Sequence, residues 1–319
     1  MTTFADGLYQ YGGSPVGVSL DVTKMFSTPY GTAQAKGRAW FVDTSSGVNG
    51  DGKSPATAFS TMDRAFDSVA SGDIIYFVGK VTEQLVTPVQ VFDVTVVGCG
   101  NRPRHADSTP TGGSWAASQW GPPASGGTAA QATVRVLQQG WRFVNILFSM
   151  IDANAAGVEI VRNAASGNSE RDGSHAEVLG CRFSGAGIGV RLTATSFTEN
   201  PFNVSIRDSK FNSCTYGILA SAAQPNSCEV INNWFQGSTN AITAKFQASR
   251  IIGNTIQGFT AASSSGGIDL RGGGGNNVIT LNYLGGTYSN AGGYNGESGD
   301  VWGANMNTLT EGWTAADPA

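Results

Sequence analysis

The chain has 319 residues, of which 13% are charged and 44 are glycine, and its formal net charge is −4. An ordinary globular domain has about 25% charged residues and about 7% glycine, so this composition favours an all-β protein with many turns. The acidic balance without a basic run excludes a typical nucleic-acid-binding protein, and no apolar run approaches the ~18 residues of a membrane-spanning helix.

Residues 1–37 differ from the rest of the chain, because they combine aromatic residues with glycines and a proline and show no sustained period. Such a segment cannot bury itself, so it is either disordered or lies extended on another surface. Large apolar side chains are uncommon in solvated tails, which favours the second interpretation. The residues predicted to dock on a partner are Leu8, Tyr9, Tyr11, Pro15 and Val16. The first six residues lack the pattern of a signal peptide, so we expect folding in the cytoplasm of the cell that makes the protein.

The folded body is predicted to begin at residue 38 with a strand, followed by a turn-rich loop over residues 45–55. One amphipathic helix is predicted near residues 60–70. Ser60 can act as its N-cap, and its apolar face comprises Phe59, Met62, Phe66 and Val69. A single helix ahead of a β-solenoid serves to cover the open end of the core.

Two apolar strands are predicted over residues 72–79 and 91–98, after which the pattern breaks until about residue 130. Loops of such length are usually functional or disordered. This long loop, residues 100–130, either makes an ordered contact with a partner or folds back over the flank of the protein. Its predicted contact residues are Arg102, Arg104, His105, Trp115 and Trp120.

From residue 143 onward the sequence repeats. Two apolar residues five positions apart recur six times, as Phe143/Phe148, Val178/Phe183, Ile206/Phe211, Val230/Phe235, Ile251/Ile256 and Ile279/Leu284. A second short apolar strand, usually introduced by glycine, follows these pairs. The variable period of 21 to 35 residues with several short strands in each repeat is typical of a solenoid.

A polar position lies inside the last four pairs, three residues after the first member, and it is occupied by Ser209, Asn233, Asn254 and Asn282. In coils stacked ~4.8 Å apart, these residues would lie above one another at a tight bend. Asparagine tolerates the left-handed conformation of a bend and can hydrogen-bond its own copy, so we predict a structural ladder. A β-sandwich is the alternative fold, but it gives no reason for one five-residue spacing to occur six times.

The sequence shows no motif for a catalytic triad or a phosphate loop. Its four cysteines lack the spacing of metal ligands, so we predict no catalytic residue, metal or cofactor. Glycan cleavage is the one catalytic function that the sequence does not argue against. It needs two carboxylates ~5–9.5 Å apart. The candidates are Glu170, Asp172 and Glu199, with Asp208 and Asp269 on predicted strands.

Residues 38–300 resemble the right-handed parallel β-helix proteins of the pectate-lyase-like superfamily. The resemblance is carried by Phe41-Val42-Asp43, Gly50-Asp51-Gly52, Ser54-Pro55, Ala58-Phe59-Ser60-Thr61 and Gly72-Asp73-Ile74-Ile75. It implies an all-β, right-handed parallel β-helix with an N-terminal capping helix. The calcium-binding carboxylates and the catalytic arginine of the polysaccharide lyases find no matching cluster in this sequence.

A narrower resemblance is to the β-helix virion proteins of tailed bacteriophages, and it is carried by residues 5–17, 98–105 and 140–146. It implies a surface protein of the virus particle, usually a trimer. We therefore expect a non-enzymatic capsid decoration protein, cement or spike, located on the capsid exterior and docked on the major capsid protein or another virion protein. A host-surface glycan is a further candidate ligand, whereas no nucleic acid or membrane partner is expected.

The alternative function is that of a tailspike-type glycan depolymerase, either a glycosidase or a lyase. About eight coils at ~4.8 Å give a column only ~40 Å tall. Residues 301–319 are too few for a trimerisation domain, so they are predicted to form a tail that covers the end of the column or reaches a neighbouring subunit. A short column with an apolar N-terminal segment favours capsid decoration over the tailspike.

Overall fold

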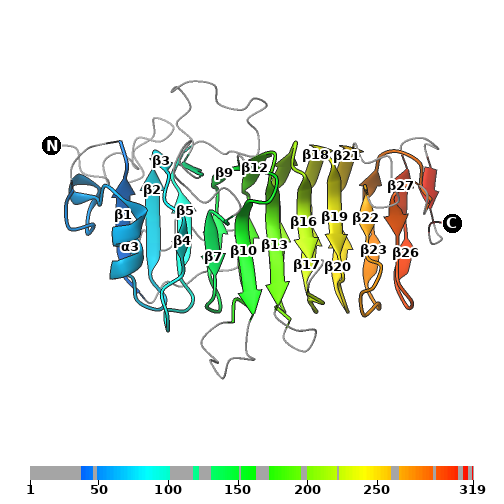
Figure 1. Ribbon diagram of the computed structural model, residues 1–319, viewed down its shortest axis with the longest axis horizontal. Coiled ribbons are helices and arrows are strands. Elements are labelled where there is room, and N and C mark those ends of the chain that lie inside the picture. The colour runs from blue at the N-terminus through cyan, green and yellow to red at the C-terminus, as the bar shows by residue number, and fades with distance from the viewer. Residues whose placement is uncertain are drawn as a thin grey trace, which may run out of the picture.

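The computed structural model describes residues 37–45, 49–100, 118–121, 131–150, 152–162, 172–194, 200–220, 223–259, 266–289, 292–307, 312–314 and 318. These residues form a right-handed parallel β-helix with three sheets and one short α-helix at the N-terminal end of the column (Figure 1). The predicted fold class is therefore confirmed.

Each coil contributes one strand to each of three sheets, which we call sheets I, II and III in the order in which a coil passes through them. Sheet I contains β1 (Ala39–Asp43), β2 (Ile74–Val78), β5 (Thr95–Gly98), β8 (Arg142–Val144), β11 (Glu177–Leu179), β14 (Ser205–Arg207), β17 (Glu229–Ile231), β20 (Arg250–Ile252), β23 (Val278–Thr280) and β26 (Val301–Gly303).

Sheet II contains β3 (Lys80–Val81), β6 (Gln119–Trp120), β9 (Leu147–Met150), β12 (Arg182–Gly185), β15 (Lys210–Asn212), β18 (Trp234–Ser238), β21 (Thr255–Phe259), β24 (Tyr283–Leu284), β27 (Asn305–Asn307) and β28 (Gly312–Thr314). Sheet III contains β4 (Leu85–Val86), β7 (Val134–Val136), β10 (Ala156–Arg162), β13 (Ile188–Ala194), β16 (Tyr216–Ala220), β19 (Asn240–Ala244), β22 (Ile268–Asp269) and β25 (Tyr294–Asn295). The named strands pair in parallel except for β27 and β28, which are antiparallel.

The predicted apolar pairs define the register of the column. Their first members form one row across sheet I, in which Phe143 pairs with Val178, Val178 with Ile206, and so on to Ile279. Their second members form a row across sheet II from Phe148 to Leu284. Both rows point inward because the turn between the two sheets is short and constant in length.

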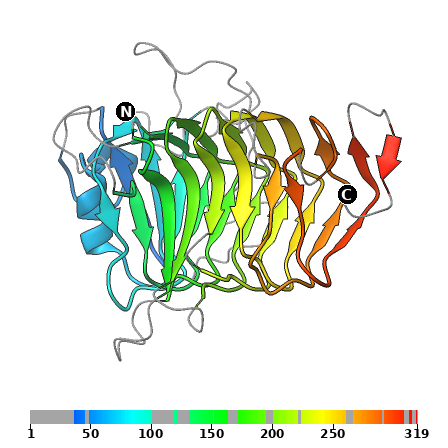
Figure 2. The ribbon, with the colours of Figure 1, turned by 45° about the vertical axis from the view of Figure 1, so that its right-hand side comes forward.

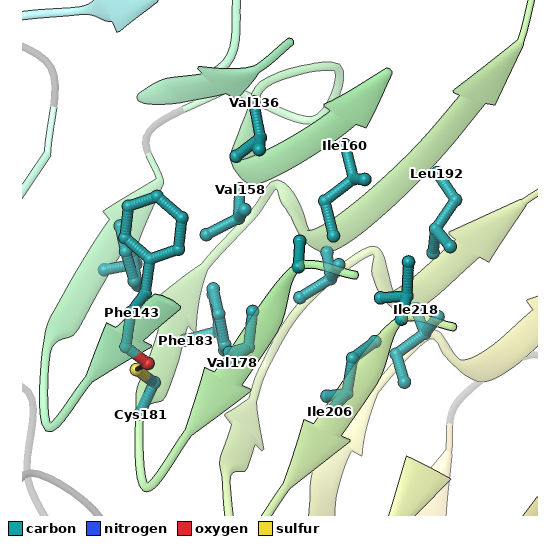
Figure 3. Packing of buried hydrophobic residues seen from close by; sticks show 14 of the residues in the cluster. Val136, Phe143, Val158, Ile160, Val178, Cys181, Phe183, Leu192, Ile206 and Ile218 are labelled. Carbon is teal, nitrogen blue, oxygen red and sulfur yellow. Dashed lines mark hydrogen bonds between the residues drawn. The ribbon is translucent and has the colours of Figure 1, made fainter. Parts of the chain in front are cut away.

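The core is a column of aligned side chains. Phe148, Phe183, Phe211 and Phe235 stack with ring centroids 5.0, 4.9 and 4.7 Å apart and nearly parallel planes. Figure 3 shows inward side chains of successive coils packed against one another. The stack also explains why glycine introduces the strands of sheet III, since a Cβ atom at Gly189 would lie 2.5 Å from the ring of Phe211.

Helix α3 (Met62–Ser68) covers the N-terminal end of this column, as predicted (Figures 1 and 2), and a 3₁₀ turn, η1 (Pro55–Thr57), precedes it. Phe66 enters the core, where its ring centroid lies 5.9 Å from that of Trp120 and 5.2 Å from that of Trp141. The prediction that Ser60 caps the helix is wrong. Thr61 occupies the N-cap position without a side-chain bond, and the carboxylate of Glu83 accepts the hydrogen bond of the Met62 N–H at 2.9 Å instead.

The boundaries of the column also differ from the sequence prediction. Strands β26 and β27 continue sheets I and II beyond residue 300, so the predicted tail begins with a further coil. The predicted strand over residues 91–98 starts only at Thr95, because Gln90 and Asp93 adopt left-handed conformations that interrupt an extended segment. The long loop is interrupted by β6, which pairs with β3 and β9.

The phenylalanine stack predicts a large effect of truncation at its centre. Replacing Phe211 with alanine removes contacts to both neighbouring rings in a rigid column, so the free energy of unfolding should fall by about 3–5 kcal/mol in a denaturant titration. Phe92→Ala, at a side chain that is 39% exposed, is the control and should cost little. If the two substitutions lowered the free energy of unfolding equally, the phenylalanine stack would not be a major contributor to the stability of the core.

Candidate functional site

The predicted polar ladder lies at the bend between sheets I and II. The structure brings Ser209, Asn233, Asn254 and Asn282 into one buried stack. The side-chain oxygen of each asparagine accepts a hydrogen bond from the backbone N–H of the residue one coil earlier, at 3.0 Å for Ser209, 2.9 Å for Asn233 and 2.9 Å for Asn254. Each amide is thus used within the protein, so the ladder holds the bend and presents nothing to a ligand.

Asn305 extends this ladder by one coil, and the prediction missed it. Its Oδ1 accepts from the N–H of Asn282 at 3.0 Å, and its Nδ2 donates to the carbonyl of Ile279 at 2.9 Å. The sequence signal was present, because Asn305 follows Trp302 by three residues. Trp302 and Asn307 have the five-residue spacing of the other pairs, but Asn307 is polar where the other pairs have an apolar residue, so this seventh pair was not recognised.

A second ladder, also missed, lies at the bend between sheets III and I. The side chains of Ser249, Asn277 and Asp300 each accept a hydrogen bond from the backbone N–H one coil earlier, at 3.0, 3.0 and 2.9 Å. Each residue directly precedes a strand of sheet I. A polar residue at this fixed position is the sequence pattern that could have predicted the second ladder. The pattern is weak, because a serine, an asparagine and an aspartate occupy the three positions.

The outer face of sheet III carries a charged cluster around Glu159, whose side chain is nearly buried. Arg135 lies one strand before it and Arg191 one strand after it in the same row. Arg135 Nε donates to Glu159 at 2.7 Å, Arg191 Nη1 lies 3.5 Å from the other oxygen, and the Thr193 hydroxyl donates at 3.2 Å. Two guanidinium groups therefore neutralise this carboxylate.

The outer face of sheet I repeats the arrangement around Glu229. Arg207 and Arg250 both donate to its carboxylate, and Arg142 pairs with Glu177 at 3.2 Å three strands earlier. Next to this cluster lies an open pocket of about 320 Å³. Its lining residues are Asn203, Val204, Ser227, Cys228, Glu229, Ala248 and Arg250.

The described candidates for glycan cleavage do not form a pair of free carboxylates. Asp172 lies 3.6 Å from Arg162 and accepts from Gln139 at 2.8 Å, while Asp269 holds Arg271 through both oxygens at 2.8 Å. Asp208 lies in the left-handed turn before the ladder. Glycan cleavage needs two carboxylates placed on either side of the scissile bond, whereas the oxygens of Asp172 and Asp269 are engaged by neighbouring side chains. Glu170 and Glu199 lie outside the described residues.

All but one of the predicted contact and docking residues lie outside the part of the chain that the structure describes. Leu8, Tyr9, Tyr11, Pro15 and Val16 lie outside the described residues, as do Arg102, Arg104, His105 and Trp115.

Trp120 is a correction to the predicted contact loop. It belongs to β6 and is fully buried, its ring stacks on Phe148 with centroids 6.1 Å apart, and its indole N–H donates to the carbonyl of Glu83 at 2.8 Å. Burial in the core leaves Trp120 no surface for a partner.

Three of the four cysteines are enclosed in the protein, and Cys99 is half-buried. Burial raises the pKa of Cys181, Cys214 and Cys228 to about 12, so these thiols stay protonated at neutral pH. No group of three histidine, cysteine, aspartate or glutamate residues that could hold a metal ion occurs among the described residues. Within the same part of the chain, no helix has the length and apolar character needed to cross a membrane.

Comparison with known proteins agrees with the fold. The model of a family described as periplasmic copper-binding protein (NosD) matches residues 132–311. Pectin methylesterase from Aspergillus niger has a similar structure, with a TM-score of 0.50 and 14% identity over 88% of each chain.

Two further solved structures are more distant. Pectate lyase Pel9A has a TM-score of 0.34 and 12% identity, covering 87% of this chain and 79% of its own. The tailspike protein gp49 from the Acinetobacter baumannii bacteriophage Fri1, a capsular polysaccharide depolymerase, has a TM-score of 0.30 and 10% identity, covering 88% and 63%. A search of the curated proteins finds no match. At these identities the structural likeness shows the fold alone.

From the ladder we predict that loss of an asparagine side chain in its interior lowers the stability of the protein. Asn254→Ala leaves the N–H of Asn233 and the carbonyl of Val230 buried without their present partners. We expect the free energy of unfolding to fall by about 2–4 kcal/mol. Asn212→Ala, on the half-buried outer side of sheet II, is the matched control and should cost about 0.5 kcal/mol or less. A small effect at Asn254 would show that the bend holds without the ladder.

The buried thiols predict a loss of stability at alkaline pH. In the unfolded chain they ionise above their ordinary pKa of 9.0, whereas burial keeps them neutral in the folded protein up to about pH 12. Their contribution to stability is therefore complete below pH 9 and is lost as the pH rises towards 12. Urea midpoints measured against pH should show this decline, and the variant with Cys181, Cys214 and Cys228 all changed to alanine should show a smaller one. An identical decline in both proteins would contradict the assignment.

Proposed function

The chain belongs to the NosD family. We propose, from the sequence resemblance and the geometry of the column rather than from this family, that it is a non-catalytic surface protein of a tailed-bacteriophage particle. In this proposal the β-helix is a rigid column that decorates the capsid exterior. The partner is the major capsid protein or another virion protein, and a host-surface glycan is a candidate ligand. The family resemblance of residues 5–17, 98–105 and 140–146 supports the assignment to a virus particle.

The copper named in the family description does not fit the described residues. Copper ions prefer thiolate, thioether and imidazole ligands. Cys181, Cys214 and Cys228 are fully enclosed and protonated at neutral pH, and no group of three histidine, cysteine, aspartate or glutamate residues that could hold a metal ion occurs in the described part of the chain. We therefore derive no function through copper.

The observation that carries a non-catalytic function is the pairing of carboxylates on the flanks of the column. Glu159 and Glu229 are each held by two arginines, and Asp172 and Asp269 each lie against one. Glycan cleavage needs two carboxylates that flank the scissile bond, and oxygens engaged by neighbouring arginines are not free to take that position. This disfavours the alternative of a tailspike-type glycan depolymerase.

The geometry of the N-terminal end supports docking by residues 1–36. The described chain begins at Gly37, beside the end of the column that α3 covers (Figure 1). Asp73 fixes this entry point, because its buried carboxylate accepts from the backbone N–H of Arg38 at 2.6 Å and from the indole of Trp40 at 2.8 Å. A segment that leaves from this point can lie across a shell while the column stands above it.

The proposal predicts that removal of residues 1–36 abolishes binding to the particle without unfolding the column. Gly37 and Arg38 remain, so the contacts with Asp73 are preserved and the far-ultraviolet circular dichroism should be unchanged. Binding would be measured by co-sedimentation with purified particles that lack the protein. The full-length Asp172→Asn variant is the control and should bind like the parent chain. Retained binding of the shortened chain would contradict docking through this segment.

A further inference from the structure

The outer face of sheet I changes its chemistry along the column. Around Glu229 it carries charged side chains that pair with one another. At the N-terminal end, where β1, β2 and β5 lie side by side (Figure 1), it carries a second apolar cluster that is separate from the core. We call this cluster the outer patch, and its members are Ala39, Phe41, Ile74, Tyr76, Val97, Cys99 and Val144. A contiguous apolar patch on the outside of a fold marks an interaction surface.

The burial of the outer patch shows that it is covered. One row of outward residues in register runs through Phe41, Tyr76, Val97, Val144, Leu179, Arg207, Ile231 and Ile252. Tyr76, Val97 and Leu179 are only 2%, 6% and 6% exposed. Ile231 and Ile252 lie on the same row and are half-buried, so the sheet alone does not enclose a side chain of this size.

The cover belongs to the chain itself. The burial of Tyr76 and Val97 is that of a single chain without a partner. Within the described part of the chain, the members of the outer patch belong to the strands of sheet I or, in the case of Cys99, directly follow one of them. No apolar side chain from another described element joins the cluster, so we look for the cover among the segments that leave the column beside it.

The chain before Gly37 is well placed to supply this cover. Gly37 directly precedes Arg38 and β1, the first strand of the outer patch, and a Cβ atom at Gly37 would lie 2.6 Å from the carbonyl carbon of Gly72, just before β2. Nineteen residues separate Val18 from Gly37 and can span about 60 Å when extended. The five strands from β1 to β11 lie ~4.8 Å apart and extend over only about 20 Å. The segment therefore has more than the length that it needs.

This segment also contains a short stretch with a suitable sequence pattern. In Val18-Ser19-Leu20-Asp21-Val22, apolar residues alternate with polar ones. Such alternation is typical of a strand that is buried on one side. In an extended conformation, Val18, Leu20 and Val22 would face the outer patch, and Ser19 and Asp21 would face the solvent.

The long loop after Cys99 is the other segment that leaves the column beside the outer patch. Residues 101–117 contain no valine, isoleucine, leucine, methionine or phenylalanine, and Trp115 is their one large apolar residue. A loop of this composition has little apolar surface to bury against a cluster of seven residues. The sequence therefore favours the N-terminal segment as the cover.

We propose that residues 18–22 lie extended along the outer patch, so that the chain covers its own flank at the N-terminal end. The predicted docking residues end at Val16, before this stretch, and stay available to a virion partner. The inference does not depend on the proposed function, because it concerns the isolated chain.

Cys99 reports on the cover, because it belongs to the outer patch and is half-buried, whereas the other three cysteines are buried. Burial raises the pKa of its thiol to about 12, so loss of the cover increases both its accessibility and its ionisation. We expect N-ethylmaleimide to modify Cys99 about tenfold faster or more in a chain without residues 1–36 than in the full-length chain. Unchanged far-ultraviolet circular dichroism would show that the column persists.

Two controls belong to this measurement. A chain without residues 1–17 lacks the docking residues but keeps the proposed cover, so it should react as slowly as the full-length chain. Cys99→Ser should abolish the fast reaction in the chain without residues 1–36, because the other cysteines are enclosed. Equal rates with and without residues 1–36 would overturn the proposal and indicate the long loop as the cover. Loss of protection on removal of residues 1–17 would also contradict it. Particle binding is not measured, so these outcomes leave the docking proposal untouched.

A direct test of contact uses the full-length chain. The three apolar residues of the stretch, Val18, Leu20 and Val22, are replaced by cysteine one at a time. At least one variant should form a disulfide with Cys99 within the same chain under mild oxidation, since such a bond needs Cα atoms within about 7 Å. Asp21→Cys, on the opposite side of the extended stretch, is the control and should not form it. Disulfides only between chains, or none in any of the three variants, would exclude the proposed cover.

Discussion

The structure depends on hydrogen bonds that run from one coil to the next at the bend between sheets I and II. An asparagine side chain in one coil accepts from the backbone of the previous coil and donates to a carbonyl further back, as Asn254 does with Asn233 and Val230. This bond fixes both the spacing and the phase of the bend. The apolar residues on either side of it therefore always point inward, and the phenylalanine stack follows from that phase.

The sequence predicted those parts of the fold that are constant from coil to coil. The five-residue spacing across the bend gave the register of sheets I and II, and the polar position inside it gave the ladder from Ser209 to Asn282. Features that occur in one coil only were not predicted, because they leave no repeated pattern in the sequence. Asn305 was concealed by Asn307, and Glu83 replaced Ser60 as the partner of the helix N-terminus because it approaches from a strand distant in sequence.

The charged clusters on the outer faces could not be predicted either. Arg135, Glu159 and Arg191 become neighbours only after loops of different lengths have been crossed, and the same holds for Arg207, Glu229 and Arg250. Trp120 was assigned to a contact loop because its sequence neighbourhood has no period. Its true neighbours are rings from other coils, which a local pattern does not contain.

The described residues thus form a column with a closed core, and Glu159, Glu229, Asp172 and Asp269 on its flanks are paired with arginines. These properties suit a rigid, non-catalytic protein that stands on a surface, which is the function proposed here. Imaging of purified virus particles at subnanometre resolution tests this account most directly. The account predicts column-shaped density repeated over the capsid shell with the helix-capped end towards it. Density confined to the tail, or absent from the particle, would contradict it.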